Sequence, residues 1–115
     1  MNEMGIGLIA DIDTVIGFSL AGIKITKTVP DDDPGAGWKV AKEAVTEIMS
    51  REDIGILIIT VKIAEGIRTH IERERQFKPL YPIIVEIPDK GGFPAGAEDP
   101  IRKLIKRTTG VEQLN

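Results

Sequence analysis

The sequence predicts an α/β fold built on a four-stranded parallel sheet. Residues 54–60, Ile-Gly-Ile-Leu-Ile-Ile-Thr, form a short run that is apolar on both alternating faces, which is typical of a strand covered by helices on both sides. Along the whole chain, short apolar runs alternate with stretches of helical period, the pattern of successive βαβ units. A chain of 115 residues can form one domain with a substantial core.

Each expected element has a local signal. The predicted elements are, in order, a strand at 6–10, a helix ending at Ala21, a half-exposed edge strand at 23–29, a helix at 38–51, a strand at 54–60, a helix at 62–76 and a strand at 83–87. Asp13 or Thr14 is expected to cap the first helix and Gly22 to end it. Residues 30–37, with their aspartates, are expected to be a solvated loop.

The alternation of elements also predicts the topology. Short connections between strands and helices imply right-handed crossovers and parallel pairing. The runs at 6–10 and 54–60 look buried on both faces, so we expect them at the centre, in the flavodoxin-like (Rossmann- or receiver-like) order 2-1-3-4. We expect a compact domain over 1–88, a Gly/Pro-rich linker over 89–99 and a C-terminal helix and tail over 100–115.

The charge is unevenly distributed between body and tail. The whole chain carries −3, yet the tail is net positive, which leaves −6 on residues 1–99. The tail's charged residues are Arg102, Lys103, Lys106, Arg107 and Glu112, and its one narrow apolar face consists of Ile101, Leu104 and Ile105. Two interpretations stay open: the basic residues dock on an acidic partner, or they only keep a short helix solvated.

Composition excludes several kinds of chemistry. The chain has no cysteine and one histidine, which excludes disulfides, thiolate metal sites and a histidine relay. No stretch approaches the roughly 20 apolar residues of a membrane span, and we see no secretion signal at the start. Residues 5–10 match G-x-G-x-x-A in letters, but the match is itself the first strand rather than a turn after one, so we do not assign it to a nucleotide.

Four side chains are candidates for a function. Asp11 and Asp13 follow the first strand and could bind Mg²⁺, but a turn-shaping and capping role is favoured. Trp38 is expected to be a core or rim anchor rather than a stacking platform. His70 has no second histidine or cysteine beside it, so a surface position is expected.

The residues resemble a known family. Residues 6–11, then Asp13-Thr14-Val15-Ile16-Gly17-Phe18, then 20–23 are similar to the opening of the F subunit of the V-type and archaeal A-type rotary ATPases. Ile58-Ile59-Thr60 with Ile63-Ala64-Glu65 and the stretch 81–88 also resemble that family. The resemblance covers most of residues 5–88.

The resemblance implies a function without catalysis. It implies a central-stalk (rotor) component of a peripheral complex on the cytoplasmic side of the membrane. Such a protein binds the coiled-coil D subunit of the shaft and couples or regulates ATP hydrolysis and synthesis. The A and B subunits of the catalytic head are further partners through the C-terminal helix; no cofactor, metal or nucleic acid is implied. The candidate partner-binding residues are Arg68, Glu72, Arg75, Ile101, Arg102, Leu104, Ile105 and Lys106.

Two other classes of function stay open at this point. One is a degenerate receiver-like signalling module, although no aspartate stands near Thr60, where a receiver carries its phospho-accepting residue. The other is a small enzyme or ligand-binding domain of flavodoxin-like shape, although the sequence offers no phosphate-binding loop.

Overall fold

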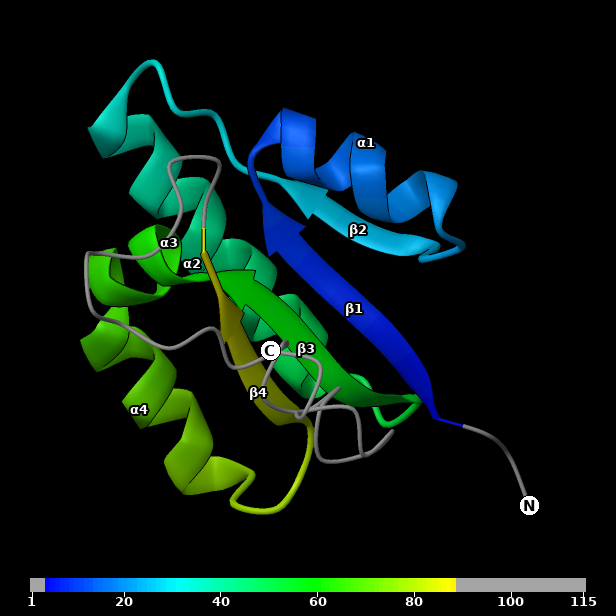
Figure 1. Ribbon diagram of the computed structural model, residues 1–115. Helices are drawn as coiled ribbons and strands as arrows, with labels where there is room; N and C mark the ends of the chain where they lie inside the picture. Colours follow the sequence, from blue (N-terminus) through cyan, green and yellow to red (C-terminus); the bar gives the residue numbers. More distant parts are fainter. Residues whose placement is uncertain (1–3, 89–115) are drawn as a thin grey trace, which may run out of the picture.

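The computed structural model describes residues 4–88, which fold into a single sheet with helices on both faces (Figure 1). The elements are β1 (Gly5–Ala10), α1 (Ile12–Leu20), β2 (Ile25–Thr28), α2 (Pro34–Ser50), β3 (Ile54–Thr60), α3 (Val61–Gly66), α4 (Arg68–Phe77) and β4 (Ile83–Ile87). All three strand pairings are parallel, and the strand order is β2-β1-β3-β4. The predicted fold class and strand order are confirmed. The linker and tail predicted over 89–115 lie outside the described residues.

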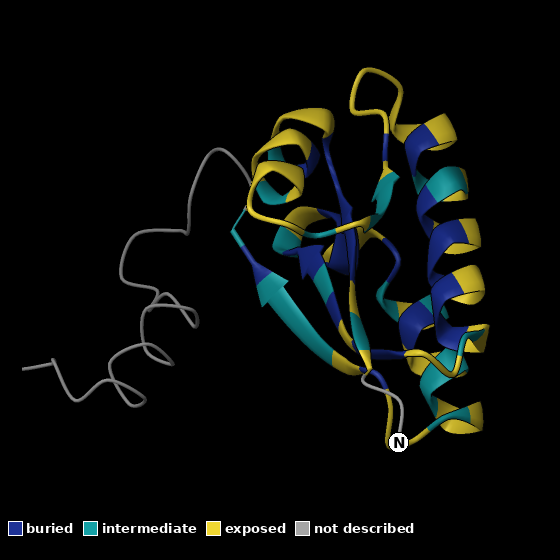
Figure 2. Ribbon diagram, turned by 90° about the vertical axis from the view of Figure 1, so that its right-hand side faces the viewer, coloured by how far each residue is buried: buried dark blue, intermediate teal, exposed yellow. Residues whose placement is uncertain are grey.

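Two apolar clusters hold the layers together. The larger cluster packs β1 and β3 against α2, α3 and α4, with Ile9, Leu57 and Ile59 fully buried. The smaller cluster lies on the opposite face, where Leu8 and Ala10 of β1 pack against α1. In Figure 2 the long helix α2 turns its dark blue, buried residues toward the sheet, and α1 lies on the other side. Alternation along the strands sends successive side chains into one cluster or the other.

The ends of α1 follow from two backbone signals. Asp11 caps the helix: the backbone N–H of Thr14 donates to Asp11 Oδ2 at 3.2 Å, and the Thr14 hydroxyl donates to Oδ1 at 2.8 Å. The expected cap at Asp13 or Thr14 is therefore wrong by a few residues. At the other end, Gly22 has φ of +109°, and the N–H groups of Gly22 and Ile23 donate to carbonyls of the last turn. This arrangement is a Schellman motif, and it confirms the predicted stop at Gly22.

Two predicted helix boundaries were wrong. Helix α2 begins at Pro34, four residues before the predicted start, because Asp33 accepts hydrogen bonds from two backbone N–H groups of the first turn. Proline tolerates the first helical position because it has no N–H to satisfy. The predicted helix over 62–76 is two helices, since Ile67, with φ of −127°, separates α3 from α4.

The strand boundaries differ only slightly from expectation. β3 and β4 have the predicted limits, β1 begins one residue earlier, and β2 is limited to Ile25–Thr28. The expectation that β3 is covered on both sides is wrong at one position, because Ile56 is 37% exposed.

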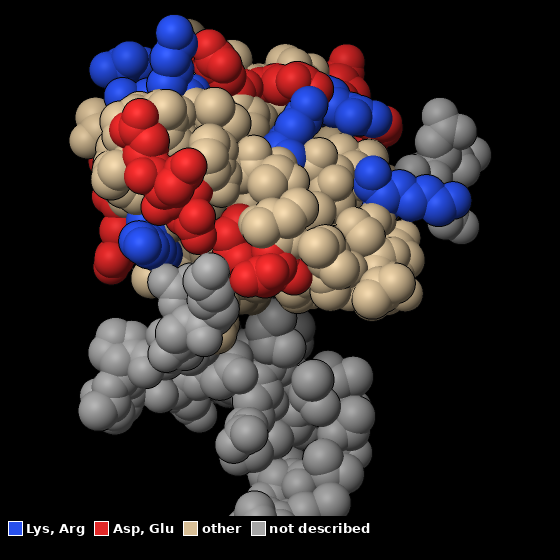
Figure 3. All heavy atoms as spheres, turned by 90° about the horizontal axis from the view of Figure 1, so that it is seen from above, with Lys and Arg blue, Asp and Glu red and all other residues tan. Residues whose placement is uncertain are grey.

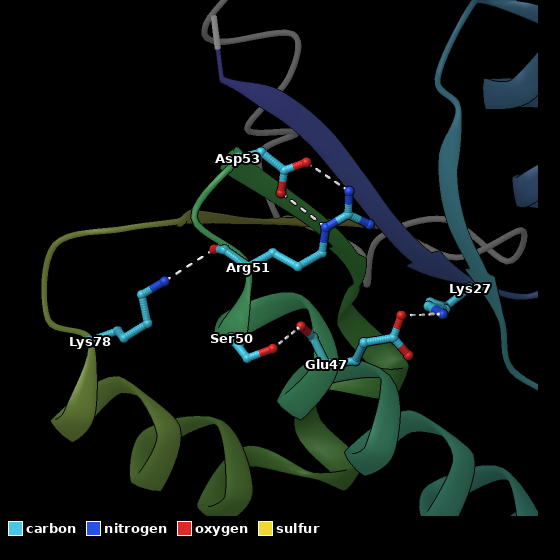
Figure 4. A network of polar contacts seen from close by, with 6 residues as sticks. All are labelled: Lys27, Glu47, Ser50, Arg51, Asp53 and Lys78. Atoms are coloured by element: carbon cyan, nitrogen blue, oxygen red, sulfur yellow. Dashed lines mark hydrogen bonds and ion pairs between the residues drawn. The ribbon is translucent and has the colours of Figure 1, made fainter. Parts of the chain in front are cut away.

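Polar contacts fasten the C-terminal end of α2 to its neighbours (Figure 4). Glu47 pairs with Lys27 of β2 at 2.7 Å, and Lys78, after α4, donates to the carbonyl oxygen of Arg51 at 3.1 Å. Arg51 also donates two hydrogen bonds to Asp53, at 2.9 and 2.7 Å, and these bonds hold the pKa of the Asp53 carboxyl below its ordinary value. The contacts fix the turn that leads from α2 into β3.

Candidate functional site

The carboxyl ends of the strands carry the polar residues that the sequence singled out. Asp11 is 8% exposed and serves as the cap of α1, whereas Asp13 is exposed in the first turn of that helix. Within residues 4–88 no group of three acidic, histidine or cysteine residues is arranged to hold a metal ion. Of this pair, Asp11 performs the capping role that was favoured from the sequence.

A pocket of about 340 Å³ lies at this same edge of the sheet. Its lining includes Asp11, Asp31, Trp38, Thr60 and Lys62. The pocket sits between the ends of β1 and β3, whose connections lead to helices on opposite faces of the sheet (Figure 1). Ligands of open α/β sheets bind at such a switch point.

Trp38 forms one wall of the pocket and is half-buried against the larger core cluster. It therefore is the rim anchor that was expected. A Cβ added to Gly66 would stand 2.5 Å from the Trp38 ring, so the indole lies flat against the end of α3. The pocket was not predicted from the sequence, because residues 30–37 were expected to be a solvated loop. The signal that could have found it is the pair of prolines, Pro30 and Pro34, which stiffens the connection beside a strand end.

The charged residues predicted on the third helix lie on α4 and make contacts within the domain. Arg68 forms a two-pronged ion pair with Glu86 of β4, through Nη1 to Oε2 and through Nη2 to Oε1 at 3.0 Å. These hydrogen bonds raise the pKa of Arg68, and Glu65 and Glu72 add smaller attractions. The attractions of Glu65 and Glu72 are thus secondary to the contact of Arg68 with the sheet.

Arg75 is also engaged inside the domain. It donates to the carbonyl oxygens of Lys78 at 3.0 Å and Pro82 at 2.6 Å, which fixes the connection from α4 to β4. Glu72 is exposed. The predicted partner role of Arg68, Glu72 and Arg75 remains a prediction. The other predicted residues, Ile101, Arg102, Leu104, Ile105 and Lys106, lie outside the described residues.

His70 links two helices instead of standing free at the surface. Its Nε2 lies 2.8 Å from the Thr46 hydroxyl on α2 and 3.9 Å from Glu74 Oε2 on its own helix. Its side chain is 18% exposed. The imidazole therefore has a structural position at the contact between α2 and α4.

The structure also contains an apolar surface that was not predicted from the sequence. Ile6, Ile56 and Ile83 are paired in register across β1, β3 and β4, and they are 38%, 37% and 54% exposed. They lie on the α1 face of the sheet, because their neighbours along each strand pack into the opposite cluster. Helix α1 contacts mainly β1 and β2 on this face. We call these three residues the isoleucine row. Further exposed apolar residues precede β4 in the sequence: Phe77, Leu80 and Tyr81.

An apolar row that no helix among residues 4–88 covers is unusual on a parallel sheet. Parallel sheets are normally covered on both faces, and an exposed apolar patch on a soluble domain commonly marks an interaction site. Among residues 4–88, no helix is both long and apolar enough to cross a membrane. An exposed apolar row of this kind is a candidate surface for a contact with another molecule.

Comparison with known proteins decides the family. The sequence profile of the family described as "ATP synthase (F/14-kDa) subunit" matches residues 6–105. The chain belongs to the F-subunit family of ATP synthases. Membership confirms the resemblance found in the sequence, and it favours that family over the receiver-like and ligand-binding alternatives.

Several archaeal members of the F-subunit family are similar to this chain over nearly their whole length. The A-type ATP synthase F subunit of Methanothermobacter thermautotrophicus is 38% identical over 109 residues, covering 95% of each chain. That of Methanocaldococcus jannaschii is 36% identical over 108 residues, covering 94% of this chain and 97% of the relative. That of Pyrococcus furiosus is also 36% identical, over 95% and 97% of the two chains.

A solved structure from the F-subunit family has the same fold. The crystal structure of the V-type ATP synthase F subunit from Archaeoglobus fulgidus superposes with a TM-score of 0.61. The identity is 24%, and the match covers 75% of this chain and 99% of the other. At this identity, the likeness supports the four-stranded parallel fold.

Proposed function

We propose that this F-subunit family member is a non-catalytic central-stalk (rotor) component of an A/V-type proton- or sodium-translocating ATPase. In this role it binds the coiled-coil D subunit of the shaft and couples or regulates ATP hydrolysis and synthesis, peripheral to the membrane on its cytoplasmic side. The observation that carries the proposal is the isoleucine row, an exposed apolar stripe on the face of a parallel sheet.

The dimensions of the isoleucine row suit a helical partner. Neighbouring strands lie about 4.8 Å apart, so three strands span roughly 10 Å, which is the width of one α-helix with its side chains. A helix with an apolar stripe could lie along the sheet and bury the row, the mode in which amphipathic helices dock into apolar grooves. A coiled-coil shaft offers such a helix surface.

The charged face of α4 supplies a second, weaker contribution in this proposal. Charged pairs at the rim of an interface set register and association rate more than affinity. Helix α4 packs into the larger cluster, on the opposite face of the sheet from the isoleucine row. Glu72, which is exposed, is therefore proposed for a separate contact with a partner rather than for the rim of the row. Arg68 and Arg75 would act mainly by keeping α4 and the connection to β4 in place.

The absence of catalysis in this proposal is supported by the roles of the polar residues described above. Asp11 caps α1, and the single histidine joins α2 to α4. These side chains have structural roles that do not involve a substrate. The chemistry of the complex would then belong to its other proteins.

The C-terminal segment has a proposed role of its own. Ile101, Leu104 and Ile105 form the apolar face of the predicted helix, and Arg102 and Lys106 contribute to its basic face. We propose that this helix contacts the shaft or the A and B subunits of the catalytic head. A Gly/Pro-rich linker would let it exchange between partners, which is a route to regulation by population shift.

Co-expression with the D subunit from the same cell tests the proposal. The full chain and the D subunit are expected to purify at moderate salt as an equimolar complex. A chain truncated after Glu98 is expected to change either the affinity for this shaft protein or the ATPase activity of the assembled complex. A well-folded full chain that does not bind the shaft would contradict the stalk role, and a truncation that leaves both properties unchanged would contradict the role of the tail.

A further inference from the structure

One further apolar side chain, that of Met4, continues the isoleucine row toward the amino end of the sheet. Met4 stands two residues before Ile6 and is 50% exposed. Successive residues of an extended chain point to opposite faces of a sheet. Gly5 faces the larger cluster, because a Cβ added to it would lie 3.5 Å from Cδ1 of Ile25, which packs against that cluster. Met4 and Ile6 therefore share the face that carries the row.

A β-bulge in β3 makes room for the Met4 side chain. The register between β1 and β3 shifts here, because Gly5 pairs with Ile54 whereas the next residue, Ile6, pairs with Ile56. Gly55 is the extra residue of the bulge. Since Ile54 packs into the larger cluster, the following position, Gly55, faces the side of the row.

Met4 occupies the space that a side chain at position 55 would fill. A Cβ added to Gly55 would stand 2.8 Å from Cβ and 2.9 Å from Sδ of Met4. Both separations are shorter than the roughly 3.5–4 Å of van der Waals contact, so a larger residue at position 55 would displace the thioether. The bulge glycine thus lets Met4 lie on β3 directly beside Ile56.

The extended surface is entirely apolar. Its residues, each between 37% and 54% exposed, are Met4, Ile6, Ile56 and Ile83. The opposite end of the sheet differs, because Figure 3, which views the domain from above, shows acidic and basic side chains gathered there beside tan surface. A helix with an apolar stripe is therefore expected to contact the surface that Met4 extends.

Methionine differs from the three isoleucines in shape and in chemistry. Its unbranched side chain has three rotatable bonds and adapts to the surface on which it packs. A peroxide oxidises its sulfur by transferring one oxygen atom: the O–O bond breaks, an S–O bond forms, and water or an alcohol leaves. The product, methionine sulfoxide, is polar. Met49, the other methionine among residues 4–88, is 1% exposed and so is shielded from this reaction.

We propose that Met4 is a further contact residue for the helix that covers the isoleucine row, and that oxidation of its thioether by a peroxide weakens this contact. The proposal rests on the stalk function, because it concerns the regulation of the same surface. In the reduced chain the Met4 side chain packs against the apolar stripe of the helix. The oxygen of the sulfoxide would have to leave water on binding without gaining a hydrogen bond, which is unfavourable.

Two variants of similar length test the contact. Met4→Leu keeps the side chain apolar and removes the sulfur, whereas Met4→Gln is polar without any oxidant. We expect Met4→Leu to bind the D subunit as the unaltered chain does, and Met4→Gln to bind about tenfold more weakly, the effect of burying one polar group. The midpoints of urea unfolding are expected to agree, because this side chain is half-exposed. Equal binding by the two variants would overturn the contact role of Met4.

Hydrogen peroxide tests the modification. The isolated full-length chain is treated, the peroxide is removed, and the dissociation constant with untreated D subunit is measured; peptide mass spectrometry locates the added oxygen. We expect treatment to weaken binding of the unaltered chain about tenfold and to leave Met4→Leu unchanged. Unchanged binding by a chain that is oxidised at Met4, or an equal loss in Met4→Leu, would overturn the proposal.

These outcomes are distinguishable from a failure of the stalk function. If a charge in the row, as in Ile83→Asp, weakens binding while Met4→Gln and peroxide do not, the shaft binds the row without Met4 and only this inference fails. If the unaltered chain does not bind the D subunit at all, the stalk function itself fails.

Discussion

At the scale of single residues, the contact between Trp38 and Gly66 shapes both the pocket and the helix pair after β3. The indole lies so close to α3 that any side chain at position 66 would overlap the ring. The wall of the pocket and the end of α3 therefore depend on one glycine.

Gly66→Ala is expected to lower the free energy of unfolding by about 1–3 kcal/mol, the usual cost of forcing extra volume into a packed contact. It is also expected to shift the fluorescence of Trp38. Gly17→Ala is the matched control, because nothing lies within 4 Å of a Cβ at this helical position. There, alanine is expected to stabilise the chain by about 0.5–1 kcal/mol. Urea unfolding measures the stability of both variants. If both changes stabilise the chain equally, the packing of the Trp38 ring does not require a glycine at position 66.

At the scale of elements, the sequence predicted the strands well and the helix ends less well. β3 and β4 were found at the predicted residues because their apolar runs are short and bounded by turn signals. The start of α2 was missed because Asp33 and Pro34 were treated as loop residues, although together they are a cap and a first helical position. The break at Ile67 was not predicted because the apolar spacing of a helix continues across it. The close packing of Trp38 on the end of α3 is a tertiary contact, which local spacing does not reveal.

The cap of α2 gives a direct test of this reasoning. Asp33 accepts hydrogen bonds from the N–H groups of Gly35 and Ala36, at 3.1 and 3.4 Å. Asp33→Ala is expected to lower the free energy of unfolding by about 1 kcal/mol. Asp32→Ala removes the same charge one residue earlier and is expected to have a smaller effect. If urea unfolding shows equal losses, charge rather than capping accounts for the result.

At the scale of the whole molecule, local patterns could not predict which strand residues stay exposed. Ile56 belongs to an apolar run that reads as buried on both sides, and its exposure depends on how far α1 extends over the sheet. The same limit applies to the charged candidates on α4. Arg68 has the spacing of a surface pair, yet its main partner, Glu86, comes from a strand distant in sequence. Contacts between elements that are distant in sequence therefore determine both the exposure of Ile56 and the partner of Arg68.

The central claim is that the isoleucine row binds the shaft, and one affinity measurement tests it most directly. Ile83→Asp places a charge in the row at a position that is 54% exposed, and Leu20→Asp makes the same kind of change on α1, where Leu20 is 85% exposed. Both variants should fold, because neither side chain is in the core.

The dissociation constant of each variant with the D subunit is then compared with that of the unaltered chain. Burying an unpaired carboxylate at an interface costs several kcal/mol, so we expect Ile83→Asp to weaken binding at least about 100-fold. Leu20→Asp is expected to bind as the unaltered chain does. Unchanged binding by Ile83→Asp, or an equal loss with Leu20→Asp, would contradict the claim that this face of the sheet holds the shaft.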